Sequence, residues 1–157
     1  VGLNVDPHDL VRQAMVEFAE TRSAMQVLAP VVAKAEGIPA TDYRDVLKAL
    51  KARQLEKSSV LPTYRRVIAQ VESTIRKQGI VTLPKREMVV RMASDAESAA
   101  IAAPHMDPPA FIGNKGERGT FVLTSGHQGR GSKQMYDDFT YGAATWTLTA
   151  HEGRPGH

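Results

Sequence analysis

Up to Gly79, the chain carries three stretches in which apolar side chains recur every three or four positions. Each stretch has helix boundary signals: Asp6-Pro7 begins the first, Gly37 ends it, and Gly79 ends the third. Apolar residues at this spacing form a stripe along a helix, and the stripe has to be buried against a partner. The stretches therefore predict long helices that pack together. Their stripes are Val11, Met15, Phe18, Met25, Leu28 and Val32, then Val46, Leu47 and Leu50, then Tyr64, Val67, Ile68, Val71 and Ile75.

After Gly79 the pattern becomes mixed, with short runs of β-branched residues and a final segment of helical spacing. We expect extended segments and two further helices. The expected extended segments are 80–84, 86–92, the proline-rich loop 104–111 and the strand 120–124, and the expected helices are 94–103 and 137–152. The final helix is expected to bury Phe139, Ala143, Trp146, Leu148 and Ala150. The sequence thus predicts a mainly α fold with a small β-sheet (α+β), its short strands near the site below, in a single domain 1–157.

Composition excludes several classes of protein. The chain has no cysteine, which rules out disulfides, cysteine-ligated zinc and a cysteine nucleophile, and fits a reducing, cytoplasmic location. The net charge is +3, and the 20 Lys and Arg residues are spread along the chain, so we expect no nucleic-acid partner. No run approaches the roughly 18 apolar residues of a membrane span, so we expect no membrane partner.

The last seven residues, HEGRPGH, combine two histidines with a glutamate. Zinc peptidases commonly place two histidines four residues apart on one helix, with a glutamate after the first. Here His157 follows His151 by six positions, which in an unbroken helix means a rise of about 9 Å and a rotation of about 240°. Two such rings could not share an ion. Pro155 and its flanking glycines interrupt the helix, so either a kink returns His157 toward His151 or GRPG is an ordinary turn.

The segment HEGRPGH resembles the signature H-E-G-x-P-G-H-H-L-Q of a bacterial family catalogued as domain of unknown function 885. Two earlier segments carry the resemblance in the family's order. VGLNVDPHDLVRQAMVEFAETRSAMQVLA is similar to G-L-x-x-x-P-x-x-L and the long helix after it, and PPAFIGNKGERGTFVLTS to P-P-x-x-D-G-x-R-P-G-x-F-Y-V-N-T. Members resemble the mostly helical gluzincins, so the resemblance implies a zinc-dependent peptidase that hydrolyses a peptide or amide bond with a metal-activated water.

The resemblance implies roles for three residues. His151 matches the first motif histidine and is expected to bind zinc. Glu152 is expected to be the general base that takes a proton from the water and passes it to the leaving amine. His157 matches the first histidine of the H-H pair, and whether it or the residue after it binds the metal stays open.

Contacts with a peptide substrate are expected around the strand 120–124. As an edge strand it would hold a peptide by main-chain bonds through Phe121, Val122 and Thr124; as a core strand it would not. Tyr141, beside the final helix, is a candidate for contact with an oxyanion. His105 is either a second metal or substrate group or an exposed loop residue.

Several departures from the family pattern bear on function. The second histidine, Leu-Gln and the later E-G-W-A-x-Y segment with its glutamate ligand are absent, and NKGERG and FVLTS replace D-G-S-R-P-G and F-Y-V-N-T. We therefore expect the N-terminal portion of a larger helical protein, inactive alone because zinc sites normally use three protein ligands. Two alternatives remain: a non-catalytic helical protein-binding module, and one half of a split hydrolase completed by a complementary chain or a second copy.

Overall fold

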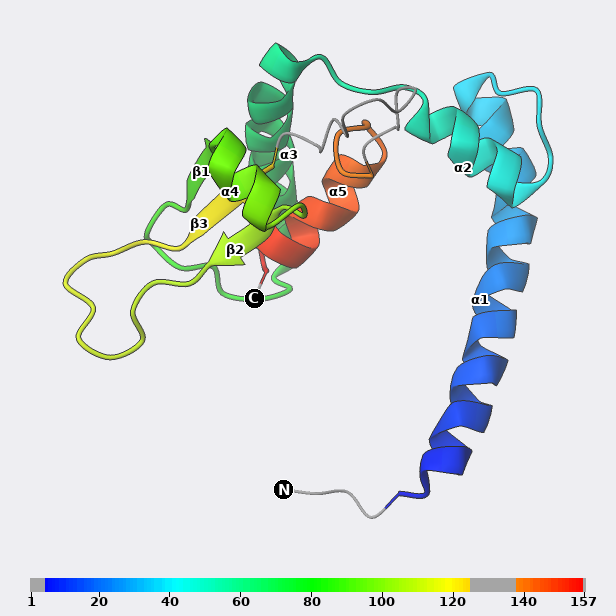
Figure 1. Ribbon diagram of the computed structural model, residues 1–157, viewed down its shortest axis with the longest axis horizontal. Helices are drawn as coiled ribbons and strands as arrows, with labels where there is room; N and C mark the ends of the chain where they lie inside the picture. The colour runs from blue at the N-terminus through cyan, green and yellow to red at the C-terminus, as the bar shows by residue number, and fades with distance from the viewer. Residues whose placement is uncertain (1–4, 125–137, 157) are drawn as a thin grey trace. The chain divides into compact units, whose positions relative to one another are not determined.

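A computed structural model of the protein describes residues 5–124 and 138–156 (Figure 1). Two compact units divide the chain, Val1–Ala49 and Leu50–His157, and the expected single domain stays a prediction. The mainly helical fold with a small sheet is confirmed. In chain order the elements are α1 (Pro7–Glu36), α2 (Tyr43–Lys51), α3 (Lys57–Gln78), β1 (Val89–Met92), α4 (Asp95–Ala100), β2 (His105–Asp107), β3 (Thr120–Leu123), α5 (Ala144–Leu148) and a π-helical turn (Thr149–Gly153).

The first unit follows its local signals closely. The Asp6 carboxylate accepts a hydrogen bond from the His8 N–H at 2.9 Å, and Gly37 ends α1 in the left-handed conformation. Gln26 then joins α1 to the start of α2, because its amide donates to the Thr41 carbonyl and accepts from the Tyr43 N–H. None of the helices in the described residues has the length and apolar character required to cross a membrane.

The buried side chains of α1 lie only near its C-terminal end, and they do not belong to the predicted apolar stripe. There Ala29 and Ala33 are buried, whereas Val11, Met15 and Phe18 are exposed. Within this unit the nine-residue α2 is too short to cover a thirty-residue helix. The expectation that the whole stripe is buried is therefore wrong for the first unit taken by itself.

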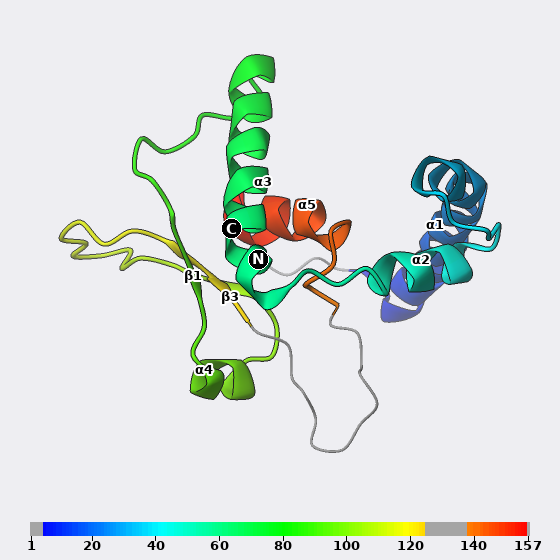
Figure 2. The same cartoon turned by 90° about the horizontal axis from the view of Figure 1, so that it is seen from above.

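The second unit is built around α3 and the sheet. The buried residues of its core are Val60, Tyr64, Ile68, Phe121 and Leu123, and Leu148 of α5 packs against them. The rings of Tyr64 and Phe121 meet edge to face, with centroids 5.6 Å apart. The Tyr64 hydroxyl donates to the Phe139 carbonyl at 2.6 Å and so joins α3 to the segment before α5. Helix α5 itself crosses α3 (Figure 2).

The three strands lie in the order β1-β3-β2, as Figure 1 shows. β3 is parallel to β1 and antiparallel to β2, with Met106 opposite Phe121. Strands form within the expected extended segments 86–92 and 120–124, over Val89–Met92 and Thr120–Leu123, whereas 80–84 forms no strand. β2 lies inside the segment expected to be a loop. Its three residues are flanked by prolines, and so short a strand shows too little alternation to be recognised in sequence.

The final helix buries a different face from the one predicted. Thr145 and Thr149 are buried, whereas Trp146 is 49% exposed and Ala150 is also exposed. A buried threonine normally has a partner for its hydroxyl; Thr145 has one, whereas the Thr149 hydroxyl has none among the described residues. The Thr145 hydroxyl donates to the Gly142 carbonyl at 2.7 Å, which leaves its methyl group to pack.

Candidate functional site

The motif glutamate lies on a single turn of π-helix that ends α5. The Arg154 N–H donates to the Thr149 carbonyl at 2.8 Å, five residues earlier, so the turn is one residue wider than an α-turn. Gly153 lies against the core: a Cβ at this position would meet Met88, Phe121 and Thr149, each at 3.5 Å. Wide turns of this kind are rare and occur frequently at functional sites.

The chain folds back immediately after the π-helical turn. The Gly156 N–H donates to the Ala150 carbonyl at 3.1 Å, and Gly156 has a φ of 65°. A Cβ at Gly156 would lie 2.4 Å from the Gly153 carbonyl oxygen, so this close approach requires glycine. The predicted interruption of the helix is thus confirmed. His157 lies outside the described residues, and its return toward His151 stays a prediction.

The two carboxylate oxygens of Glu152 have different neighbours. Oε2 accepts a hydrogen bond from the main-chain N–H of Met106 in β2, at 3.2 Å. Oε1 lies 3.6 Å from Nε2 of His151. The Glu152 side chain is 15% exposed and that of His151 is 66% exposed, so the glutamate lies between the sheet edge and an imidazole open to solvent.

Arg154, the variable position of the motif, is buried beneath the turn. Its Nη2 donates to the Arg86 carbonyl at 2.7 Å, and its Nε lies 3.6 Å from Oε1 of Glu72 in α3. Nη1 is buried without a hydrogen-bond partner among the described residues. Sequence reasoning missed this residue, because an arginine at a variable motif position carries no signal that it is buried.

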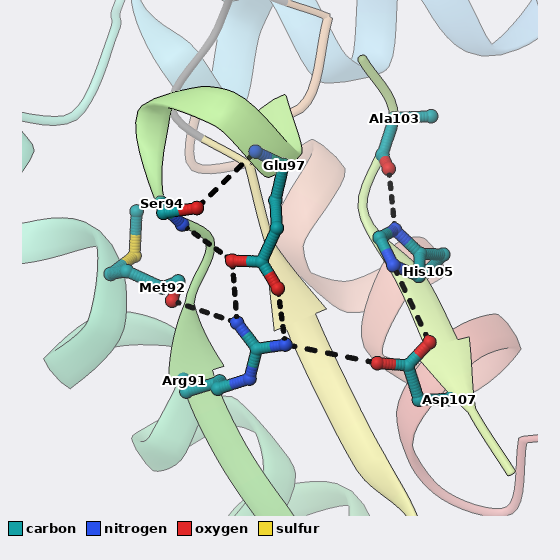
Figure 3. Close-up of polar contacts among 7 residues, drawn as sticks. All are labelled: Arg91, Met92, Ser94, Glu97, Ala103, His105 and Asp107. Carbon is teal, nitrogen blue, oxygen red and sulfur yellow. Dashed lines mark hydrogen bonds and ion pairs between the residues drawn. The ribbon is translucent and has the colours of Figure 1, made fainter. Parts of the chain in front are cut away.

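A polar cluster links β1 and α4 to β2, the strand that bonds to Glu152 (Figure 3). Arg91 holds Glu97 through two hydrogen bonds of 3.0 and 2.8 Å, and Arg91 Nη2 lies 3.8 Å from Asp107. His105 Nε2 lies 3.6 Å from Asp107, and its Nδ1 lies 3.0 Å from the Ala103 carbonyl oxygen. His105 is therefore a partly buried residue of β2, so the exposed-loop alternative is wrong, and its role as a metal or substrate group stays a prediction.

The charges of this cluster act most strongly on Glu97. The Arg91 side chain, followed by the N–H and hydroxyl of Ser94, lowers the pKa of Glu97 to about 2. Glu97 in turn raises the pKa of Arg91. Ser94 and Glu97 also form a reciprocal capping box, so α4 begins where the cluster is anchored.

Three of the residues predicted to contact substrate lie on β3 or directly after it, and that role stays a prediction. Phe121, Val122 and Thr124 are buried, and the Thr124 hydroxyl donates to the Ala102 carbonyl at 2.9 Å. β3 is the middle strand, so the edge-strand hypothesis is wrong and the core-strand alternative holds. Tyr141 lies before the N-terminal end of α5, whereas Glu152 follows its C-terminal end. The intervening helix, at about 1.5 Å per residue, keeps the two residues apart.

The described residues contain no group of three or more His, Cys, Asp or Glu side chains arranged to hold a metal ion. At the motif they supply the exposed imidazole of His151, with the carboxylate of Glu152 beside it. An imidazole is an ordinary zinc ligand, so this donor set fits zinc when further ligands complete it.

Comparisons with known proteins identify one family. The family model described as a bacterial protein of unknown function (DUF885) matches residues 1–157. Neither the curated proteins nor the solved structures contain a match to the chain.

Proposed function

We propose that this chain, which belongs to the bacterial family of unknown function DUF885, carries part of the active site of a zinc-dependent peptidase. The single observation that carries the proposal is the arrangement of Glu152. A mostly buried carboxylate beside an exposed imidazole, on a rare wide turn, is poorly explained by folding needs alone. The likeness of HEGRPGH to a zinc-peptidase signature also supports it.

The metal would be held by His151 and by a second imidazole, from His157 or from a residue after it in a longer chain. A third ligand would come from outside the described residues. Zinc would supply Lewis acidity, which makes a water molecule more acidic and polarises the scissile carbonyl.

Glu152 would then perform the proton transfers. Its carboxylate would accept a proton from the attacking water as the new C–O bond forms, and would deliver that proton to the amine nitrogen as the C–N bond breaks. The substrate class is a peptide or another amide.

The test uses the protein as isolated from its natural source. Its intact mass and zinc content are measured first, and then its hydrolysis of a peptide library. We expect about one zinc per chain. The substitution Glu152→Gln should leave the zinc bound and lower the rate about 10²–10⁴-fold. The control Glu87→Gln, which changes an exposed glutamate, should leave the rate unchanged. Absence of both zinc and hydrolysis from the natural protein would refute the proposal.

A second candidate function is a non-catalytic helical module that binds a protein partner. It is favoured by the exposed apolar residues of α1, among them Val11, Met15 and Phe18. The two candidates differ in their response to Glu152→Gln, because a binding module would keep its partner and would contain no stoichiometric zinc.

A further inference from the structure

We propose that Met106 is a positioning residue for Glu152, which it holds through its main-chain N–H. The inference rests on the proposed function for its catalytic consequence. One oxygen of the carboxylate is fixed to the edge of the sheet, and the other is thereby directed to the side of the His151 imidazole, where the proton would be taken.

The register of the sheet explains why this donor is available. β2 is an outer strand, and it pairs with β3 alone. In an antiparallel pair, successive residues alternate between those that exchange main-chain bonds with the partner strand and those that do not. Since the Met106 N–H donates to Glu152, Met106 belongs to the second set, and its main-chain groups face away from β3.

The bond also compensates for the burial of Glu152. A carboxylate with only 15% of its side chain exposed loses much of its hydration and needs hydrogen-bond donors in return. The Met106 N–H is such a donor, and a bond to an ionised acceptor is about twice as strong as a neutral one. The same contact therefore makes burial tolerable and selects one orientation of the carboxylate.

A main-chain donor on this strand is held more rigidly than a side-chain donor would be. Both residues that flank Met106 belong to the polar cluster of Figure 3. Asp107 lies 3.8 Å from Arg91, which is itself fixed by two bonds to Glu97, and His105 lies 3.6 Å from Asp107. The cluster thus joins β2 to β1 and α4 through Asp107, directly after the donor, and His105 on the other side contacts Asp107.

The position of Oε1 completes the geometry. With Oε2 bonded to Met106, Oε1 lies 3.6 Å from Nε2 of His151, the proposed metal ligand. The assignment is therefore that Oε2 anchors the side chain and Oε1 exchanges the proton. A group that must abstract a proton gains most from a fixed orientation, because small misplacements cost large factors in rate.

The first experiment measures the contact itself, without any enzymatic activity. Amide hydrogen exchange at Met106 is followed by NMR in the whole protein and in Glu152→Ala. We expect the Met106 amide to exchange at least about tenfold faster in the variant, because its acceptor is removed. The amide of Asp107, which faces β3, is the internal control and should not change. Equal exchange at Met106 in both proteins would overturn the proposal.

The second experiment measures the catalytic consequence with two substitutions at one position. Met106→Pro removes the N–H, and an edge strand tolerates proline where the N–H faces away from its partner. Met106→Ala shortens the side chain and keeps the N–H. We expect kcat to fall about 10–100-fold in Met106→Pro alone, with KM and zinc content unchanged. A kcat in Met106→Pro equal to that in Met106→Ala would overturn the positioning role.

The two experiments separate this proposal from the proposed function. A zinc-free natural protein without hydrolysis, but with faster Met106 exchange in Glu152→Ala, would refute the peptidase and retain the contact. An active zinc enzyme in which the Met106 amide exchanges at the same rate with and without Glu152 would retain the peptidase and refute the positioning role.

Discussion

The Nε of Arg154 lies 3.6 Å from Oε1 of Glu72, beneath the turn that follows the motif glutamate. The pair joins the end of the π-helical turn to the middle of α3, and the bond from Arg154 to the Arg86 carbonyl adds the segment before β1. Arg154 is buried and Glu72 is mostly buried, so removal of either partner leaves the other poorly compensated.

Substitution Arg154→Met should destabilise the fold by about 2–3 kcal/mol, since it leaves the Arg86 carbonyl and Glu72 without this partner. The value lies below that of a fully buried pair because Glu72 keeps its bond to Arg76. The matched control is Arg76→Met, which removes the other cation paired with Glu72, an exposed arginine, and should cost less than about 0.5 kcal/mol. Urea unfolding measures both, and equal losses would contradict the buried role of Arg154.

Substitution Gly156→Ala should distort the turn that follows the motif. It combines a positive φ with a Cβ only 2.4 Å from the Gly153 carbonyl oxygen. Gly113→Ala is the control, because Gly113 also has a positive φ and nothing lies within 4 Å of its Cβ. We expect about 1 kcal/mol for the control and at least about 2 kcal/mol for Gly156→Ala in urea unfolding. A cost for Gly156→Ala no larger than that of the control would show that the turn relaxes.

Glu97 should make the stability of the second unit depend on pH in the acid range. Its pKa of about 2 lies below the ordinary value of 4.5, because the charged form is held by Arg91 and Ser94. Its contribution is therefore fully present above about pH 4.5 and is lost as the pH falls toward 2. Glu97→Gln keeps a capping side chain and removes the charge. The difference in unfolding midpoint between wild type and Glu97→Gln should be constant near neutral pH and shrink below pH 4.5. A difference independent of pH would contradict the charge effect.

Removal of the His151 imidazole should abolish zinc retention if the proposed function is right. Metal analysis of His151→Ala, purified from the natural host, is expected to find at least tenfold less zinc than in wild type. The control His8→Ala changes another exposed histidine and should keep its zinc. Equal zinc in both variants would remove His151 from the ligand set.

Phe121 and Phe111 provide a paired test of the core assignment. Phe121 is 0% exposed in the contact with Tyr64, whereas Phe111 is 100% exposed. Phe121→Ala should cost about 3–5 kcal/mol in urea unfolding, and Phe111→Ala less than about 0.5 kcal/mol. A small loss for Phe121→Ala would return this residue to the list of substrate contacts.

Much of the second unit was predictable because its signals are local. Gly79 ends α3 as predicted, and the predicted short helix at 94–103 is confirmed in α4, where Ser94 and Glu97 form a capping box. The burial of Trp146 was predicted wrongly, because helical spacing identifies a possible stripe and not the surface that receives it. Thr145 is the buried residue of α5 instead, and its hydroxyl bonds to the Gly142 carbonyl just before the helix.

The sequence by itself determined where α1 begins, where α1 and α3 end, the mainly helical class, and the interruption of the last helix at 153–156. These features depend on residues close together in the chain, such as a carboxylate two positions from an N–H or a glycine at a positive φ. Tertiary structure alone decided that Met106 meets Glu152 and Arg154 meets Glu72. Each of these pairs joins residues far apart in the chain through the stacking of α5 on α3 and the sheet, and no local pattern records such a contact.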